Sequence, residues 1–289
     1  MSAVEIPVRD LTAASLSGWS IEIVPTEIAL VDPAIQSLEQ GTEIYVASIP
    51  GRDTNYIVET SARLRKANFE PIPHISARGL KNMDQLDDLL ARLRSEADVR
   101  RALLIGGDID DSKIGAFASS RAMLETGLFA RHGFKSVGFA TYAGPHPQIA
   151  KDVLDSELIS KLKLATEQGL SSWLVTQLCF DPDMIIRHTE HLRNEGVSAP
   201  IHVGVVGPTG WKSMARFAMI CGVSTSAKSL TTQGSRIGRL LLGYEPTEIL
   251  SRLALVAANR PDLGFPKVHF FTFGGISKTV DWIKSFMGQ

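Results

Sequence analysis

Cysteine and long apolar runs are what this sequence has least of. The chain of 289 residues contains only Cys179 and Cys221, and neither belongs to a Cys-x-x-Cys pair. This excludes a disulfide framework and a thiolate metal site, and we expect both thiols to be buried. No apolar run approaches the ~20 residues of a membrane span, and residues 1–18 carry both charge signs without the apolar core of a signal peptide. We therefore expect a soluble, cytoplasmic protein without a membrane partner.

An excess of one charge sign is also absent. The formal net charge is −1, and lysine and arginine are spread along the chain, so the basic footprint of a nucleic-acid-binding protein is missing. With 44% hydrophobic residues and no biased tract, the composition is that of an enzyme-sized globular domain. No linker or shift in composition marks a boundary, so we predict a single domain over residues 1–289.

Short β-rich segments alternate with longer helical patterns along the chain, which predicts an α/β fold. The predicted strands are Trp19–Val24, Glu43–Ser48, Glu70–Ile75, Arg101–Ile105, Ser136–Thr141, Ser172–Thr176, Ile201–Val206 and Val268–Thr272. The predicted helices are Ile57–Ala67, Met83–Ala97, Ala116–Glu125, Ser156–Gln168, Pro182–Asn194, Lys212–Cys221 and Thr247–Ala258. Eight such units in roughly 250 residues predict a (β/α)8 TIM barrel. The second choice, a doubly wound open sheet, would want a glycine-rich turn where the sequence has Pro25-Thr26-Glu27.

Polar side chains follow the predicted strands, at the barrel end where such folds place their chemistry. The clearest case is the apolar run Trp173-Leu174-Val175-Thr176, after which Gln177 is a candidate ligand-orienting amide. The other strand ends carry Glu22, His74, Gly106-Gly107-Asp108, Tyr142, His146 and Phe271. The pattern predicts a ring of functional groups around one mouth.

Glu22 is the sharpest single candidate in this ring. It lies between Ile21 and Ile23, and an acid flanked by apolar strand residues must form a pair, become protonated or take part in chemistry. As a general acid it would have a pKa raised by burial from about 4.3 toward about 6–7. A structural salt bridge is the alternative.

Two further motifs have a functional and a structural interpretation. Gly106-Gly107-Asp108 lets the backbone approach a ligand beside a carboxylate, but glycine-glycine-acid also describes a plain turn or a helix N-cap. Trp211 follows the seventh strand, where its ring either stacks on a planar ligand or packs into the barrel rim.

The remaining histidines do not predict a metal site. His188 and His191 are three residues apart on a predicted helix, and without a third ligand we interpret them as a solvated helix face. His132, His202 and His269 are interpreted as structural. An acid, an amide and aromatic rings without a metal set indicate a flat organic ligand and an organic cofactor.

Taken in order, the strand-end motifs resemble methylenetetrahydrofolate reductase, the flavin-dependent (β/α)8 enzyme of one-carbon metabolism. The motifs are Ser20-Ile21-Glu22-Ile23-Val24-Pro25-Thr26, Pro73-His74-Ile75-Ser76, Gly106-Gly107-Asp108, Tyr142 with His146-Pro147, Thr176-Gln177-Leu178-Cys179-Phe180-Asp181 and His269-Phe270-Phe271-Thr272. The resemblance spans nearly the whole chain and is to the catalytic domain, without the regulatory domain that eukaryotic members append.

This resemblance implies FAD as cofactor and hydride transfer between flavin N5 and the one-carbon unit of a folate. It implies that Glu22 is the general acid that opens the five-membered ring of 5,10-methylenetetrahydrofolate, and that Asp108 tunes the flavin. It also implies that Gln177 orients the pterin and that Trp211 and Phe271 contact the substrate. The implied FAD contacts are His74, Gly106, Gly107, Asp108, Phe117, Ala118, Tyr142, His146 and Lys163.

The sequence departs from the family pattern at several contacts. Gly106 stands where members usually have an arginine, Lys161 and Lys163 are the candidates for a lysine before the sixth strand, and Phe271 replaces a frequent tyrosine. Gly274-Gly275 replace polar residues associated with nicotinamide or folate. We therefore hypothesise a folate-linked flavoprotein that uses NAD(P)H poorly and runs from 5-methyltetrahydrofolate toward 5,10-methylenetetrahydrofolate.

Two other classes stay open. One is a flavin-free barrel that binds folate or passes methyl groups between partner proteins, and the other is a non-enzymatic scaffold. Because the resembled family commonly forms homo-oligomers, we also expect a dimer or tetramer.

Overall fold

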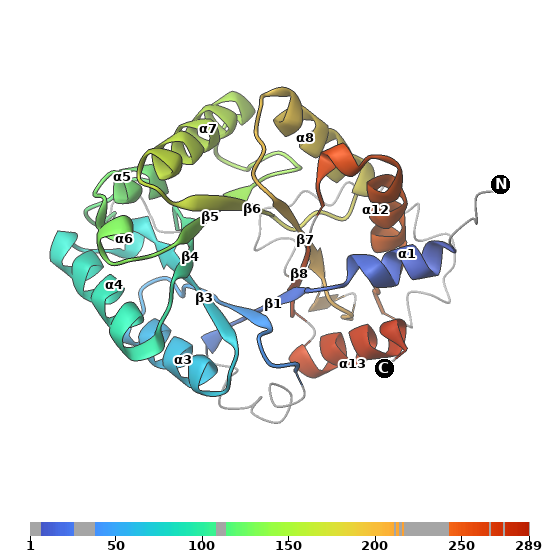
Figure 1. The fold of residues 1–289 in the computed structure, drawn as a ribbon, viewed down its shortest axis with the longest axis horizontal. Helices are drawn as coiled ribbons and strands as arrows, with labels where there is room; N and C mark the ends of the chain where they lie inside the picture. The colour runs from blue at the N-terminus through green and yellow to red at the C-terminus, as the bar shows by residue number, and fades with distance from the viewer. Residues whose placement is uncertain are drawn as a thin grey trace. The chain divides into compact units, whose positions relative to one another are not determined.

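A closed barrel of eight parallel strands, in the order β1 to β8, forms the centre of the computed structural model (Figure 1). The structure describes residues 7–25, 38–107, 114–210, 212–213, 216, 243–265, 267–273 and 275–288. Helices follow most of the strands in the chain, as in a (β/α)8 barrel. The predicted fold class is therefore confirmed.

All eight predicted strands are present, and their ends differ from the prediction by at most two residues. The strands are β1 Ser20–Ile23, β2 Glu43–Val46, β3 Glu70–Ser76, β4 Arg101–Ile105, β5 Ser136–Thr141, β6 Ser171–Thr176, β7 Ile201–Val206 and β8 Lys267–Phe271. The helices are α1 Val8–Ser15, α3 Asn55–Lys66, the 3-10 turn η2 Ala77–Gly79, α4 Met83–Ala97, α5 Ser120–Leu124, α6 Leu128–Arg131, α7 Lys151–Glu167, α8 Pro182–Asn194, α12 Thr247–Asn259, the 3-10 turn η4 Pro261–Leu263 and α13 Ile276–Met287.

The helix predictions were less complete than the strand predictions. The helix expected over Ala116–Glu125 is only Ser120–Leu124, because the Ser119 side chain accepts a hydrogen bond from the Ala122 amide and caps the helix there. Helices α1, α6 and α13 were not predicted. Most of the helix expected over Lys212–Cys221 lies outside the described residues.

The chain groups into two compact units. The β2–β5 unit comprises Ile21–Thr141 and Lys151–Val175, and the β7–β8 unit comprises Met1–Ser20, Tyr142–Ala150 and Thr176–Gln289. No helix in the described part of the chain is long and apolar enough to cross a membrane.

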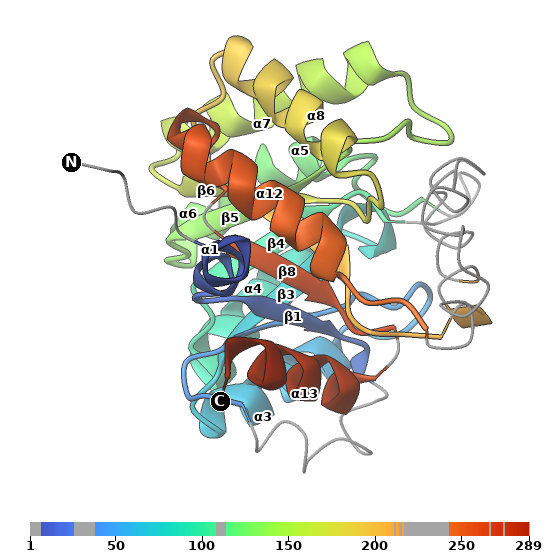
Figure 2. The same ribbon diagram turned by 90° about the vertical axis from the view of Figure 1, so that its right-hand side faces the viewer.

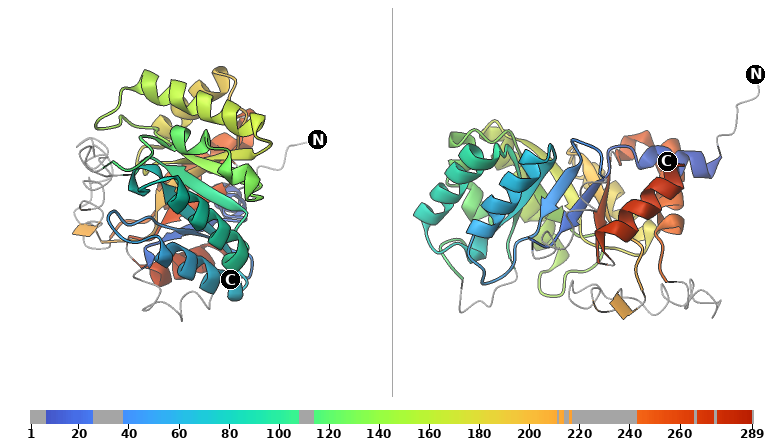
Figure 3. Two further views of the ribbon diagram at one scale, coloured as in Figure 1. Left: turned by 90° about the vertical axis from the view of Figure 1, so that its left-hand side faces the viewer. Right: turned by 90° about the horizontal axis from the view of Figure 1, so that it is seen from below.

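In the β2–β5 unit, helices α3 and α4 lie side by side on the outside of the parallel strands (Figure 3). Helix α4 begins at the Asn82 cap, whose side chain accepts a hydrogen bond from the Gln85 amide, and ends at Asp98 with a left-handed φ of 43°. Its buried face has helical spacing and consists of Leu86, Leu89, Leu90, Leu93 and Ala97. This spacing turns one apolar stripe toward the core.

Inside the barrel, the indole of Trp173 lies in the core of the same unit. Its Nε1 donates a hydrogen bond to the Tyr45 hydroxyl at 3.0 Å, and both side chains belong to a cluster with Ile72, Leu103 and Val175. Gly138 makes room for the indole, because a Cβ at this position would lie 2.5 Å from the Trp173 ring. The absence of a side chain on β5 therefore determines how the interior packs.

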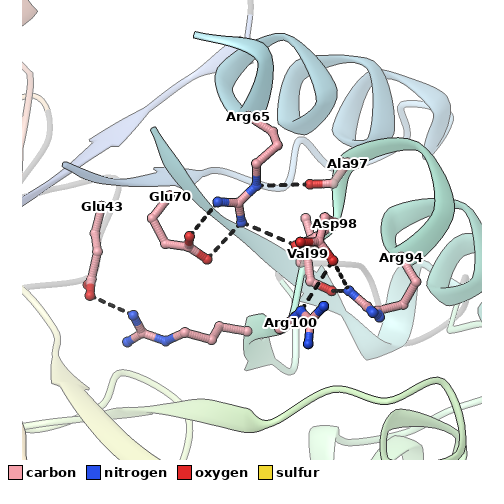
Figure 4. Close-up of polar contacts among 9 residues, drawn as sticks. Glu43, Arg65, Glu70, Arg94, Ala97, Asp98, Val99 and Arg100 are labelled. Atoms are coloured by element: carbon pink, nitrogen blue, oxygen red, sulfur yellow. Dashed lines mark hydrogen bonds and ion pairs between the residues drawn. The ribbon is translucent and has the colours of Figure 1, made fainter. Parts of the chain in front are cut away.

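A network of charged groups lies where strands β2, β3 and β4 begin (Figure 4). Arg65 donates two hydrogen bonds to the Glu70 carboxylate at 2.6 and 2.9 Å, and Arg94 donates one to Asp98 at 2.6 Å. Arg101 donates to Glu43 at 2.5 Å. Barrel enzymes place chemistry at the opposite, carboxyl end of the strands, so we interpret this network as structural.

In the β7–β8 unit, strands β7 and β8 pair in register, with Gly204 opposite His269 and Val206 opposite Phe271. Helix α1 lies against α12 (Figure 2). On the outer face of β8, Phe270 packs between Trp19 and Trp282, with ring centroids 6.1 and 6.2 Å away.

Candidate functional site

Glu22 and His74 face each other at the carboxyl ends of β1 and β3. Ile21 and Ile23 are fully buried, and since successive strand residues point to opposite faces, Glu22 points into the barrel. His74 Nε2 lies 3.4 Å from Glu22 Oε2, with side-chain exposures of 9% and 17%. The Tyr45 ring meets the His74 ring edge-on at 5.9 Å. Glu22 therefore lies within ion-pair distance of a titratable group, and the two side chains form an ion pair when His74 is protonated.

The carboxyl ends of β3 and β4 come together through backbone contacts. The Arg78 amide donates to the Gly106 carbonyl at 2.9 Å, and Ser76 Oγ approaches the same carbonyl at 3.5 Å. Gly107 has a φ of +96°, and a Cβ there would lie 2.0 Å from Ser76 Oγ, so only glycine fits. At Gly106, in contrast, a Cβ would meet no described atom within 4 Å. The described residues therefore leave room for a side chain at position 106.

Arg78 is a cation at this strand end that was not predicted from the sequence. It lies in η2, directly after β3, and its Nε donates to the Ala118 carbonyl at 3.1 Å. Its own carbonyl accepts from the Gly115 amide at 3.0 Å, which fixes the segment that carries Phe117 and Ala118. Phe117 is buried and Ala118 is exposed. The available signal was the arginine placed two residues after the Pro73-His74-Ile75-Ser76 motif.

Tyr142 and His146 come together in the β7–β8 unit, just after β5. Their rings meet edge-to-face with centroids 4.8 Å apart. His146 Nδ1 accepts hydrogen bonds from the amides of Gln148 and Ile149, both at 3.1 Å. An Nδ1 that accepts carries no proton, so the neutral ring holds its proton on Nε2.

Gln177 follows β6, where Thr176 Oγ1 accepts a hydrogen bond from the Gly204 amide of β7 at 2.8 Å. The Gln177 Oε1 accepts a hydrogen bond from the Leu178 amide at 2.9 Å, so the Gln177 side chain is folded back on the turn. Gly204 cannot carry a side chain, because a Cβ would lie 2.3 Å from the Thr176 carbonyl oxygen. The carboxamide orientation is therefore set by the local backbone, and its Nε2 donates no hydrogen bond to the described residues.

Phe271 lies in an aromatic cluster at the carboxyl end of β8. Its ring stacks on that of Phe273 at 5.6 Å with 15° between the planes, and the rings of Phe180 and Tyr244 meet edge-to-face at 5.7 Å. The cluster also contains Leu178 and Val206. Tyr244 is anchored by two backbone hydrogen bonds with Thr209, and burial raises the pKa of its hydroxyl. Of these rings, only Phe271 was predicted from the sequence.

The family of this chain is decided by its match to a family model. The model described as methylenetetrahydrofolate reductase matches residues 51–233, which is more than half of the chain. The chain belongs to the methylenetetrahydrofolate reductase family. The matched range includes the carboxyl ends of β3 to β7, and Glu22 and Phe271 lie outside it.

Two solved structures resemble that of this methylenetetrahydrofolate reductase family member. An uncharacterized protein from Clostridium thermocellum that binds two copies of 5-methyl-5,6,7,8-tetrahydrofolic acid aligns with a TM-score of 0.56 and 10% identity, over 97% of this chain and 98% of its own. Dihydropteroate synthase from Thermus thermophilus aligns with a TM-score of 0.45 and 9% identity, over 93% of this chain and 92% of its own. The first of these likenesses supports the barrel fold.

Three predicted site residues of this family member remain, namely Asp108, Lys163 and Trp211. Asp108 and Trp211 lie outside the described residues. Lys163 lies in the middle of α7, where its side chain is 78% exposed and its Nζ is 3.9 Å from Glu167. A position on the outer helix layer is not where barrels bind ligands, so we leave Lys163 out of the proposed site. Lys161, the other candidate, is also on α7, and its Nζ lies 5.2 Å from the centroid of the Phe139 ring of β5.

The histidines of α8 depart from the solvated face that we predicted. His188 is buried, with 6% exposure, because it lies on the inner face of the helix with Ile185 and Leu192. No group of three or more histidine, cysteine or acidic side chains that could hold a metal occurs among the described residues. Cys179 is buried, as predicted, and burial raises the pKa of its thiol. Cys221 lies outside the described residues.

Proposed function

We propose that this chain is a flavin-dependent oxidoreductase that interconverts 5,10-methylenetetrahydrofolate and 5-methyltetrahydrofolate with FAD as cofactor. The observation that carries the proposal is the inward-facing pair of Glu22 and His74 at the carboxyl ends of β1 and β3. Family membership supplies the reaction class. A shielded carboxyl group at the functional end of a barrel is suited to deliver a proton to a bound substrate.

The residues after β3 and β4 fit one part of a dinucleotide cofactor. None of the described atoms crowds Gly106, which suits the close approach of a flat or phosphate-bearing ligand to the backbone. Arg78, fixed through Nε to the Ala118 carbonyl, places a guanidinium beside this turn, and such a group suits a phosphate. We infer that Arg78 supplies the positive charge that Gly106 lacks. When bound, FAD would supply the hydride acceptor and donor that the protein side chains do not provide.

Glu22 has a defined task in this proposal. In the direction of methylenetetrahydrofolate reduction, its carboxyl group donates a proton to a nitrogen of the five-membered ring, and that carbon–nitrogen bond breaks. The resulting iminium carbon is the electrophile that accepts the hydride. In the reverse direction, the Glu22 carboxylate takes the proton from the same nitrogen as the ring closes.

The β7–β8 unit offers groups of the kind that recognise a pterin. The amide of Gln177 is oriented by its bond to Leu178 and suits the donor and acceptor pattern of a pterin edge. Phe271 and Phe273 are stacked aromatic rings, a suitable surface for a flat ring system. The Clostridium thermocellum protein with the same fold binds 5-methyltetrahydrofolate, which supports folate as the ligand class.

We further propose that the enzyme uses NAD(P)H poorly and runs toward methylfolate oxidation. Phe271 brings no hydroxyl to the end of β8, and Gly275, with a φ of +107°, brings no side chain. A nicotinamide carries an amide group that loses its hydrogen bonds to water when it enters a site. Without polar protein groups to replace those bonds, the nicotinamide binds more weakly, whereas an apolar ring is less affected.

The alternative is a flavin-free barrel that binds folate or transfers methyl groups, and the glycine at position 106 favours it. The anaerobic visible spectrum of the purified protein separates the two, recorded before and after 5-methyltetrahydrofolate and, in a second sample, NADH. Flavin absorbance that bleaches with methylfolate but not with NADH is the expected result. A protein that stays colourless after incubation with FAD and still binds folate would establish the alternative.

A further inference from the structure

His74 stands next to Glu22 in a position that a purely cofactor-binding histidine does not need. Its Nε2 is 3.4 Å from the Glu22 carboxylate, and both side chains are largely shielded from water. The Tyr45 ring supports the imidazole from the side, and Tyr45 is itself held by the hydrogen bond from Trp173. The imidazole is thus set against the carboxylate by the packed barrel interior.

We propose that His74 is the positioning residue that stores the proton delivered by Glu22, so that the two side chains work as one acid that carries a single proton at neutral pH. The inference rests on the proposed function for its chemistry. It extends that function to the source of the proton, which neither the fold nor the family match assigns.

Glu22 needs a neighbour that stores its proton because a lone carboxyl group is costly to keep protonated at neutral pH. A glutamic acid has an ordinary pKa of about 4.3, so it needs a large upward shift before it holds a proton at pH 7. An imidazole begins at about 6.5, and an adjacent carboxylate favours its charged form further. The pair therefore holds its first proton more readily than a lone glutamic acid does, although burial of the imidazole opposes this effect, and the two groups titrate together.

The proton balance of the proposed step is complete. The N–H bond of the His74 imidazolium breaks as an O–H bond forms on Glu22, and the O–H bond then breaks as the folate nitrogen gains the proton. The pair ends as a neutral imidazole and a carboxylate, and solvent returns the proton to His74 for the next turnover. In the reverse direction, the folate nitrogen gives its proton to Glu22 and from there to His74.

The other described titratable groups of β2 and β4 that face this interior do not compete for the proton. Burial raises the pKa of Tyr45, so its hydroxyl stays neutral across the working range. Glu43 is neutralised by Arg101 at 2.5 Å, and the Arg101 guanidinium lies over the Trp173 ring.

Histidine ring NMR tests the coupling without FAD or folate. In protein labelled at histidine Cε1, the His74 signal, assigned by its loss in His74→Gln, is followed from pH 5 to 9 in wild type and in Glu22→Gln. We expect the apparent pKa of His74 to fall by at least about one unit in Glu22→Gln, a tenfold loss of proton affinity. Asp87→Asn is the matched control, because it removes a carboxylate that lies 2.8 Å from another histidine, His132, in the same unit and should leave the His74 signal unchanged. An unchanged His74 titration in Glu22→Gln would overturn the proposal.

The pH profile of the reaction provides the second test. In FAD-loaded protein, the rate of methylenetetrahydrofolate reduction should fall with rising pH through the apparent pKa of the pair. In His74→Gln, which keeps the size but cannot titrate, the fall should begin at least one pH unit lower, with about tenfold less kcat at pH 7 when the variant is saturated with FAD. Superimposable profiles would refute the role of His74. A wild-type protein that does not bind FAD refutes the proposed function instead, and the NMR result still decides the coupling.

Discussion

Replacing Gly138 by alanine would place a methyl group inside the barrel, where the Trp173 indole now lies. The added Cβ would lie 2.5 and 2.6 Å from two carbons of the indole and 2.9 Å from a Leu103 methyl. Contacts this short force the indole to move, and Trp173 cannot move without straining its hydrogen bond to the buried Tyr45 hydroxyl. Overpacking of this kind costs ~1–3 kcal/mol of unfolding free energy. With an unfolding entropy of ~2.1 cal/mol/K per residue, the 289-residue chain would lose roughly 2–5 °C of Tm at this cost.

Thermal unfolding followed by circular dichroism measures the effect, with Gly210→Ala as the matched control. A Cβ at Gly210 would meet no atom of the described residues within 4 Å, so that variant should keep or slightly raise the Tm. Trp173→Phe completes a double-mutant cycle, because the smaller ring does not extend to the crowded indole carbons. We expect Gly138→Ala to cost at least about 1 kcal/mol less in the Trp173→Phe background than in wild type. Equal costs in both backgrounds, or a Gly138→Ala variant as stable as Gly210→Ala, would refute the packing argument.

Three further substitutions test the proposed chemistry and the electrostatics. Glu22→Gln should keep the flavin spectrum but lower folate turnover by ~10²–10⁴, and normal turnover in a rapid-mixing assay would end its role as the acid. Arg78→Met should weaken FAD binding by roughly 10- to 150-fold, the effect of ~1.5–3 kcal/mol for a charge-assisted hydrogen bond, and leave riboflavin binding unchanged. Arg92→Met on the surface of α4 is its control in the fluorescence titration, and an equal loss of riboflavin binding would contradict phosphate recognition. Burial lowers the pKa of Lys161 to about 8, so the unfolded chain binds more protons than the folded one between pH 8 and 10.5, and the Lys161 contribution to stability rises with pH through that window. Lys161→Met should therefore raise the Tm at pH 7, with a benefit of up to about 3 kcal/mol that shrinks as the pH rises above 8 and disappears only above about pH 10.5, and a constant benefit would count against a buried ammonium group.

The strand segments could be predicted because buried strands have a clear sequence pattern. Runs such as Ile201–Val206 are apolar at nearly every position, as expected for a parallel sheet covered on both faces, and β4, β5 and β7 were predicted with the bounds that the structure has. The sequence pattern of the helices was less clear. Helix α6 has only four residues, and Ala116–Glu125 was predicted too long because the Ser119 cap was not recognised. A cap depends on one side-chain hydrogen bond, which periodicity does not reveal.

The positions of the site residues could be predicted, but their partners could not. Glu22 and His74 were both expected at strand ends, yet nothing in their spacing along the chain says that Nε2 and Oε2 lie 3.4 Å apart. That distance depends on the register of β2 with β3, which places Tyr45 opposite Ile72 and turns both into the interior with His74. Register is a property of paired strands and is not written in either strand alone.

In the β2–β5 unit, one glutamate lies at each end of the strands, and the two glutamates have partners of different chemistry. Where β2 and β4 begin, Glu43 meets Arg101, and at the carboxyl ends Glu22 meets His74. A guanidinium keeps its proton at any physiological pH, so the pair of Glu43 and Arg101 cannot release one and contributes only attraction and geometry. An imidazole changes charge near neutrality, so the pair of Glu22 and His74 can give up a proton and take it back. An arginine at position 74 would preserve the ion pair but remove the exchangeable proton, so we expect the partner of Glu22 to set the pH range over which this carboxyl group acts as an acid.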